Sequence, residues 1–117
     1  MKRGDIYWAN LLPRSGSEQK GRRPVVVMSH DGFNQTSGWC SIIVVPLSTS
    51  GSQAKRGPTA VPLVEGAGGL KKAGIALCHQ VTTLDRAKLT DLIGTLSRTL
   101  LTQIENGLKI ALGFDPL

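Results

Sequence analysis

Aromatic residues are scarce in this sequence: one Tyr, two Phe and two Trp make up 4% of 117 residues. The only cysteines, Cys40 and Cys78, form no C-x-x-C pair, which excludes a zinc box and a disulfide-rich framework. We expect both thiols to be reduced and to lie in or beside the core. No apolar run approaches the roughly 18 residues of a membrane span, and the start lacks the apolar segment of a signal peptide. These absences predict a cytoplasmic protein with no membrane partner.

Acidic residues are also few, and the positive charge that results is unevenly distributed. The formal net charge is +6. Residues 1–72 hold ten Lys and Arg against four Asp and Glu, whereas residues 73–117 hold four of each. A balance of this kind favours polyanionic partners, with nucleic acid ahead of a lipid surface. From charge alone, a merely soluble basic surface is the alternative.

Short apolar segments separated by turn signals predict one mainly β domain spanning residues 1–117. Its length allows a single core that buries only about two thirds of the unfolded surface, which leaves apolar area for a partner. Strands are expected at 4–11, 25–29, 41–48, 59–64, 74–84 and 92–96. Five or six short strands of this kind predict a small barrel. The range 25–29 is apolar on both faces and predicts a central strand, whereas Pro46 and Pro62 indicate a bulge or a sheet edge.

The end of the chain carries the pattern of an amphipathic helix. Ser97 suits the N-cap position and Gly113 the position just after the last turn. Between them, apolar residues repeat at helical spacing: Leu100, Leu101, Ile104, Leu108, Ala111 and Leu112. The helix is expected to pack on the barrel or on a partner.

A polar, basic loop at 16–24 runs directly into the apolar range 25–28. A glycine at each side lets the backbone bend, and Pro24 should fix the start of the strand. Arg22 and Arg23 would then be held at a rigid edge, where arginine forks can make bidentate contacts to phosphate oxygens. Loops as long as 12–22 in a compact domain are usually functional.

Residues 4–11, followed by G-S-E-Q-x-G-x-R-P and a Val-rich strand, resemble the opening of the MazF/PemK family of toxin endoribonucleases. The resemblance is strongest over residues 3–29 and recurs in 42–48, 74–85 and 92–113. It implies a Src-homology-3-like barrel of the CcdB/PemK type with a C-terminal helix, and a homodimer. It also implies a toxin of a type II toxin–antitoxin system that a cognate antitoxin blocks. The activity implied is cleavage of single-stranded RNA (mRNA) at a short sequence, without metal or other cofactor, by attack of the 2′-hydroxyl, which leaves a cyclic phosphate and a 5′-hydroxyl.

The same resemblance places the catalytic arginine at Arg23 and a catalytic hydroxyl at Ser48, where relatives usually carry threonine. Arg23 would stabilise charge on the phosphorane. The structural alternative for Arg23 is a surface ion pair with Glu18. For Ser48 it is a strand-end hydroxyl that satisfies the backbone of the following turn.

Further substrate-binding candidates lie in the two basic loops and in the strand at 74–84. They are Ser17, Glu18, Gln19, Lys20, Arg22, Lys55, His79 and Gln80. Arg22 would contact a phosphate. Some relatives carry an Arg-x-Asp acid–base pair where this sequence has Leu77 and His79, so that pair cannot be transferred. His79 is either a proton-transfer group or a polar residue facing solvent or the dimer groove.

Two other functional classes also fit these sequence features. Gyrase inhibitors of the CcdB type resemble this fold without being nucleases, and the exposed aromatic that they use near the C-terminus has a counterpart in Phe114. A non-catalytic nucleic-acid-binding barrel would bind RNA and leave it intact. Tyr7, Phe33 and Trp39 are candidates to stack unpaired bases.

Overall fold

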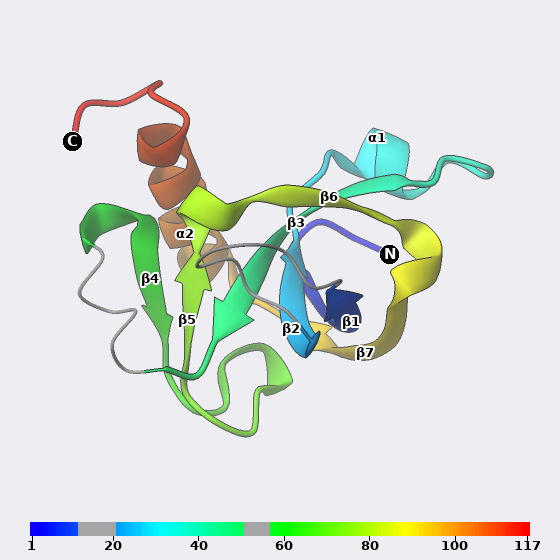
Figure 1. Cartoon of the computed structure of the whole chain (residues 1–117), viewed down its shortest axis with the longest axis horizontal. Coiled ribbons are helices and arrows are strands. Elements are labelled where there is room, and N and C mark those ends of the chain that lie inside the picture. The colour runs from blue at the N-terminus through cyan, green and yellow to red at the C-terminus, as the bar shows by residue number, and fades with distance from the viewer. Residues whose placement is uncertain (12–20, 51–56) are drawn as a thin grey trace.

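The computed structural model describes residues 1–11, 21–50 and 57–117. Within these ranges it forms seven strands: β1 (Asp5–Leu11), β2 (Gly21–Val27), β3 (Ser41–Ser48), β4 (Ala60–Leu63), β5 (Gly74–Leu77), β6 (Thr82–Asp85) and β7 (Leu89–Thr95). The helices are α1 (Asp31–Asn34) and α2 (Arg98–Ala111), with short 3-10 turns η2 (Ala67–Gly69), η3 (Cys78–Gln80) and η4 (Arg86–Lys88). Figure 1 shows α2 packed beside the strands. The predicted mainly β fold with a C-terminal helix is confirmed.

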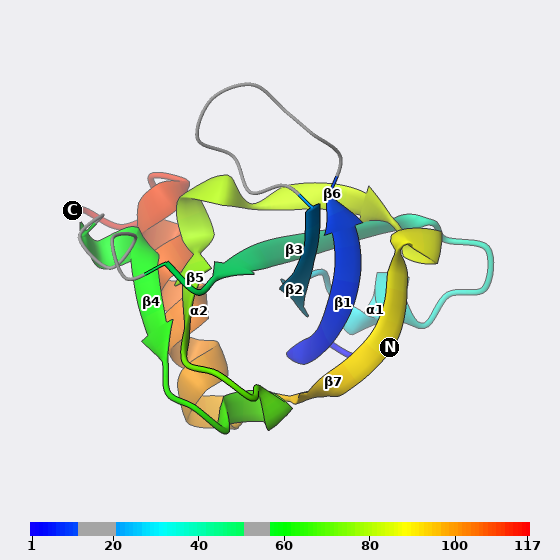
Figure 2. The ribbon, with the colours of Figure 1, turned by 60° about the horizontal axis from the view of Figure 1, so that its bottom comes forward.

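The strands form one antiparallel sheet in the order β4-β5-β3-β2-β1-β7, with β6 paired to β3. The sheet curves until β1, β2, β3, β6 and β7 encircle an interior, as Figure 2 shows. β4 is an edge strand and its Pro62 is exposed, as the sequence predicted. A proline is tolerated there because an edge strand has backbone groups that need no partner.

Two apolar clusters lie on opposite faces of this sheet. The barrel interior is filled by Ala9, Leu11, Val25, Val27, Ile42, Val44, Leu84 and Leu89. The outer face packs against β4, β5 and α2 through a second cluster that includes Ile6, Val26, Val45, Leu63, Leu101 and Ile104. β2 contributes to both clusters, which explains why its residues 25–27 are apolar without alternation. The prediction of a central strand at this point is confirmed.

β2 begins earlier than the sequence predicted. Arg22 and Arg23 lie within the strand instead of in a loop before it, and Pro24 pairs with Trp8 of β1. The reason is tertiary, because β1 runs to Leu11 and pairs with β2 as far as Gly21. The two arginines are therefore held by a strand ladder.

The single long strand expected at 74–84 is also wrong, because η3 divides it into β5 and β6. Val44 of β3 pairs with Thr82, whereas Leu47 pairs with Ala76. Two residues of β3 thus face five residues of the partner segment, and the extra residues form the turn. The interruption lies opposite Pro46, which has no N–H to offer a neighbouring strand. β7 begins three residues earlier than the strand expected at 92–96.

α2 has the predicted ends. The Ser97 hydroxyl accepts a hydrogen bond from the backbone N–H of Leu100 at 3.3 Å, and Gly113 follows the last turn with φ +82°. A Cβ at Gly107 would lie 2.7 Å from the Cys78 sulfur, so the helix approaches the barrel closely at this glycine. None of the described helices is long and apolar enough to cross a membrane.

The two cysteines have different environments. Cys78 is buried against α2, and burial raises its pKa to about 12. Cys78 is therefore a packing residue at neutral pH, as expected. Cys40 is exposed, so the expectation that both thiols lie in or beside the core is wrong for Cys40.

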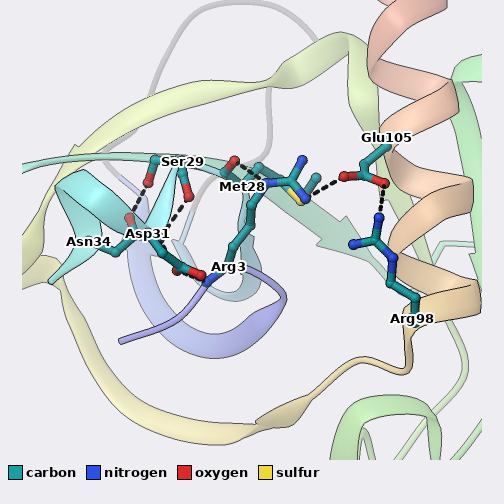
Figure 3. Close-up of polar contacts among 7 residues, drawn as sticks. All are labelled: Arg3, Met28, Ser29, Asp31, Asn34, Arg98 and Glu105. Atoms are coloured by element: carbon teal, nitrogen blue, oxygen red, sulfur yellow. Dashed lines mark hydrogen bonds and ion pairs between the residues drawn. The ribbon is translucent and has the colours of Figure 1, made fainter.

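Arg3 joins three separated parts of the chain (Figure 3). Its Nε donates to the carbonyl of Met28 at 3.1 Å, and its guanidinium pairs with Glu105 of α2. Its backbone N–H donates to the Asp31 carboxylate at 2.6 Å, and Asn34 donates to the same oxygen at 3.0 Å. The first residues of the chain, the end of β2, α1 and α2 are thereby fastened together. We call Arg3, Met28, Asp31, Asn34 and Glu105 the Arg3 network.

Candidate functional site

A pocket of about 550 Å³ opens on the outer face of the barrel, where β1, β2 and β7 meet the chain between η2 and β5. We call it the Trp8 pocket. Its lining consists of four basic side chains (Arg22, Arg23, Lys71, Lys72), an apolar group (Trp8, Pro24, Leu70, Leu92, Ile93), and Thr49, Gly69 and Asp91. A concave apolar surface with several cations and one carboxylate suits a ligand that is both flat and anionic.

One wall of the Trp8 pocket comes from three neighbouring strands. Trp8 pairs with Pro24 on one side and with Asp91 on the other. Arg22 precedes Pro24 by two residues and so projects from the same face of the sheet. The strand register alone therefore places Trp8, Arg22 and Asp91 side by side, although they are far apart in the sequence.

The segment that contributes Gly69, Lys71 and Lys72 to the lining lies close to the backbone of β7. A Cβ at Gly69 would lie 2.6 Å from the Ile93 carbonyl oxygen, and one at Gly94 would lie 2.2 Å from that of Gly68. Gly69 also has φ +84°, a conformation that glycine adopts without strain. This contact carries Lys71 and Lys72 to the pocket. Neither lysine is among the site residues that the sequence predicted.

Arg22 is held in a defined position within the pocket. Its NH2 group donates to Asp91 Oδ2 at 2.9 Å, and its guanidinium carbon lies 4.5 Å from the centre of the Trp8 ring. The Thr90 hydroxyl donates to the same carboxylate oxygen at 3.3 Å. Trp8 belongs to the strand expected at 4–11, and neither Trp8 nor Asp91 is among the site residues that the sequence predicted. No local signal connects these residues, because β1, β2 and β7 meet only in the folded sheet.

Arg23 and Ser48 lie at the same end of two adjacent strands. Arg23 is half-buried in β2 and lines the Trp8 pocket. The β2–β3 ladder runs to Val25 and Pro46, and continuing its register two residues further would set Arg23 across from Ser48. Ser48 instead pairs with Ile75 of β5. The strands therefore bring the two predicted catalytic residues to one region of the barrel.

The Ser48 hydroxyl has a structural partner. Ser48 is buried, and its Oγ accepts a hydrogen bond from the backbone N–H of Ser50 at 3.1 Å. This is the contact that the structural alternative for Ser48 predicts, although the hydroxyl keeps its own proton to donate. Thr49 is exposed and lines the Trp8 pocket with Arg23, so it is a second hydroxyl to consider. The sequence feature that could have indicated Thr49 is its position next to Ser48.

His79 and Gln80 lie in η3, outside the lining of the Trp8 pocket. His79 is exposed, and its Nδ1 lies 3.3 Å from the Thr59 hydroxyl. The predicted residues Ser17, Glu18, Gln19, Lys20 and Lys55 lie outside the described residues. The structure therefore brings together Arg22 and Arg23 from the predicted set, with Ser48 near them.

The other aromatic candidates lie elsewhere. Phe33 and Trp39 stack on each other with ring centres 4.7 Å apart, on the connection between β2 and β3. Tyr7 is half-buried and packs against the interior cluster. Phe114 is exposed after the end of α2. Among residues 1–11, 21–50 and 57–117, no group of three or more His, Cys, Asp or Glu side chains is placed to hold a metal ion.

Comparison with known proteins identifies relatives over the whole chain. Residues 2–112 match the family described as PemK-like, MazF-like toxin of type II toxin-antitoxin system. The endoribonuclease MazF of Staphylococcus epidermidis is 35% identical over 98% of this chain and 93% of its own length. The crystal structure of MazF (form I) from Deinococcus radiodurans superposes with a TM-score of 0.78 at 27% identity, covering 97% of this chain and 96% of that one. A MazE–MazF crystal structure (form II) from the same organism has a TM-score of 0.73 at 27% identity, covering 98% and 97%.

Proposed function

This chain belongs to the PemK-like, MazF-like family of type II toxin–antitoxin toxins, and we propose that its Trp8 pocket and the adjoining strand ends are where it cuts RNA. It acts as an endoribonuclease, the activity of a relative that matches nearly its full length. This evidence favours the nuclease over the gyrase-inhibitor alternative. The single observation that carries the site is Arg23, held by the β1–β2 ladder at the edge of a cationic pocket.

The proposed reaction is attack of an RNA 2′-hydroxyl on the adjacent phosphorus, without a metal. The P–O bond to the 5′-oxygen of the next nucleotide breaks, which leaves a 2′,3′-cyclic phosphate and a 5′-hydroxyl. Such a reaction needs a base for the 2′-hydroxyl proton, an acid for the leaving oxygen, and positive charge at the phosphorane. Arg23 supplies the charge, because its fork matches the phosphate oxygens and its strand position fixes it in advance.

Ser48 is the proposed hydroxyl partner of Arg23. Its Oγ is oriented by the Ser50 N–H and can donate its own proton to a phosphate oxygen. Thr49 is the competing candidate, since it faces the pocket that Arg23 lines. A comparison of Ser48→Ala with Thr49→Val separates the two residues, because each change removes one hydroxyl. We expect the Ser48 variant to lose more cleavage activity.

The remaining predicted contacts extend the RNA path from this centre. Arg22 lines the same pocket. Ser17, Glu18, Gln19 and Lys20 precede β2 in the sequence, and Lys55 follows β3. His79 and Gln80 in η3 would contact RNA away from the scissile phosphate. The substrate is single-stranded, because an exposed base can enter a pocket only when it is unpaired.

Three further properties follow as proposals. MazF of Deinococcus radiodurans has been crystallised as MazE–MazF, and we propose that a cognate antitoxin likewise covers the site of this chain. We propose a homodimer, because exposed apolar side chains remain on the described surface outside the Trp8 pocket, among them Leu112 and Phe114. A cytoplasmic location follows from the substrate, since mRNA is found there.

The first experiment is incubation of the purified protein with a long, structure-poor RNA in the presence of EDTA, with cut ends mapped by primer extension. Discrete cuts at one recurring short sequence, absent with Arg23→Ala, are the expected result. Cuts that require added magnesium would contradict the metal-free mechanism. Intact RNA with a folded wild-type protein would contradict nuclease activity, and inhibition of gyrase in a supercoiling assay would then support the other class.

A further inference from the structure

We propose that Trp8, Arg22 and Asp91 form a preassembled platform on which one unpaired RNA base stacks, next to the phosphate held by Arg23. The inference rests on the proposed function and adds to it a base-binding subsite and a positioning residue, Asp91. In this proposal Arg22 contributes to RNA binding mainly through its flat guanidinium group and less through its charge.

The geometry of Arg22 supports a stacking role. The guanidinium carbon lies 4.5 Å from the centre of the Trp8 ring, the distance of a stacked cation–π pair. RNA-binding proteins commonly stack unpaired bases on aromatic rings and on guanidinium planes. A guanidinium already resting on Trp8 offers such a plane without further loss of side-chain freedom when RNA binds.

Asp91 fixes the orientation of that plane. Its Oδ2 accepts from Arg22 at 2.9 Å and from the Thr90 hydroxyl at 3.3 Å, so it is itself anchored. The Asp91 charge also offsets that of Arg22, which weakens the attraction of Arg22 for a phosphate. Asp91 therefore acts through Arg22 and is a positioning residue.

The surroundings of the platform match a nucleotide. Arg23 is the next residue of β2, and Lys71 and Lys72 line the same pocket. Phosphates on either side of a stacked base would thus meet cations, as in other single-strand grooves that combine basic and aromatic side chains. Leu92 lines the pocket and is largely exposed, so it offers apolar contact to the edge of the base.

The test compares Arg22→Lys with the wild-type protein. Lysine keeps the positive charge and loses the plane. If Arg22 stacks a base, the dissociation constant for a short single-stranded RNA and the KM for cleavage should both rise about tenfold, with kcat unchanged. The slope of binding against salt should stay the same, because the number of neutralised phosphates does not change. Binding of Arg22→Lys at wild-type affinity would overturn the proposal.

A spectroscopic readout separates stacking from charge. A 2-aminopurine placed beside the mapped cut position, in an RNA with a 2′-deoxy sugar at the cut, loses fluorescence when it stacks. We expect quenching by the wild type and by Arg98→Lys, and much less by Arg22→Lys. Arg98→Lys is the matched control, since it makes the same change at an exposed arginine of α2 outside the pocket lining. Equal quenching by Arg22→Lys and wild type would contradict the platform.

Asp91 is tested by a conservative pair. Asp91→Asn should reduce the quenching because it removes the negative charge that holds Arg22, and Asp91→Glu should restore part of it. If Asp91→Asn binds RNA more tightly, with a steeper salt dependence, Arg22 is a phosphate contact and the proposal fails.

A failure of the proposed nuclease function can be distinguished from a failure of the base-binding platform. If the wild-type protein cuts no RNA, the 2-aminopurine can be placed within a homopolymeric RNA, and quenching on binding still tests the platform. If the Arg22 variant binds RNA normally and loses only its inhibition by the antitoxin, the pocket binds a peptide and the RNA platform is wrong.

Discussion

Two arginine–carboxylate pairs in this protein look alike as contacts and differ in what surrounds them. Arg3 pairs with Glu105 at a site where the two side chains are 27% and 21% exposed. Arg22 pairs with Asp91 where they are 55% and 66% exposed. The first pair is embedded in the Arg3 network, whereas the second forms part of the lining of the Trp8 pocket.

The difference lies in how many of the hydrogen-bonding groups are used inside the protein. Arg3 also donates to the Met28 carbonyl, and its position connects the N-terminal residues to α2. Arg22 rests on an aromatic face, donates to Asp91 and lines the Trp8 pocket. An arginine enclosed by carbonyls and carboxylates stabilises the fold, whereas one at the surface of a basic pocket remains available to a ligand.

The largest difference between the effect on cleavage and the effect on stability is expected for Arg23→Ala, in the Trp8 pocket. Loss of a preorganised cation from a phosphorane should lower kcat/KM by about 100-fold or more. The urea midpoint of unfolding should change little, because the side chain is only half-buried. Arg98→Ala, on the exposed surface of α2, is the matched control and should cleave normally. Similar losses in both variants would mean that bulk charge, and no particular arginine, drives cleavage.

Arg3→Ala should show the opposite behaviour. Removing its side chain leaves the partly buried Glu105 and the Met28 carbonyl without this donor, which costs about 2 kcal/mol in free energy of unfolding. Cleavage per folded molecule should be unchanged. Urea denaturation and an activity assay on the same sample measure both quantities, and Arg98→Ala should cost less than about 0.5 kcal/mol. A folded but inactive Arg3→Ala protein would show that Arg3 is needed for cleavage, so the two pairs would not differ in role.

A smaller effect is expected for Asp31→Asn within the Arg3 network. The pKa of Asp31 is lowered from 3.8 because the backbone N–H of Arg3 and then the Asn34 amide donate to its carboxylate. A lowered folded-state pKa contributes stability above the unfolded value, and that contribution is lost as pH falls through the folded pKa. Wild type and variant should therefore differ in urea midpoint at pH 7 and converge in acid. A difference that persists below the lowered pKa would point to a cause other than ionisation.

The smallest stability effect is expected for Asp91→Asn. An exposed ion pair contributes little, so the free energy of unfolding should change by less than about 0.5 kcal/mol. The same variant should alter RNA binding measurably if the platform is correct. The free energy of unfolding of this variant, from thermal or urea unfolding, should be compared with that of Glu105→Gln, which changes the carboxylate of the other pair. A large loss of stability in Asp91→Asn would assign the Arg22 pair to the fold.

Local patterns in the sequence predicted several elements correctly. Val25, Val26 and Val27 indicated a strand covered on both faces, and Ser97 and Gly113 indicated the two ends of α2. These features depend on nearest neighbours along the chain, on backbone preference and on apolar spacing. The motif before Pro24 is also a local string of residues, and it led to the proposal that Arg23 is catalytic, which cleavage by Arg23→Ala would test.

Contacts between distant strands decided the rest. The η3 turn follows from a register shift against β3, and the early start of β2 follows from pairing with β1. The Trp8 pocket combines side chains of β1, β2 and β7 with two lysines carried there by glycine-permitted backbone contact. The sequence by itself determined a mainly β fold with a C-terminal helix, and its motif singled out Arg23, the arginine that we propose to bind the phosphate. Only the tertiary structure decided which carboxylate and which aromatic face meet Arg22, because strand pairing brings together residues that have no relation along the chain.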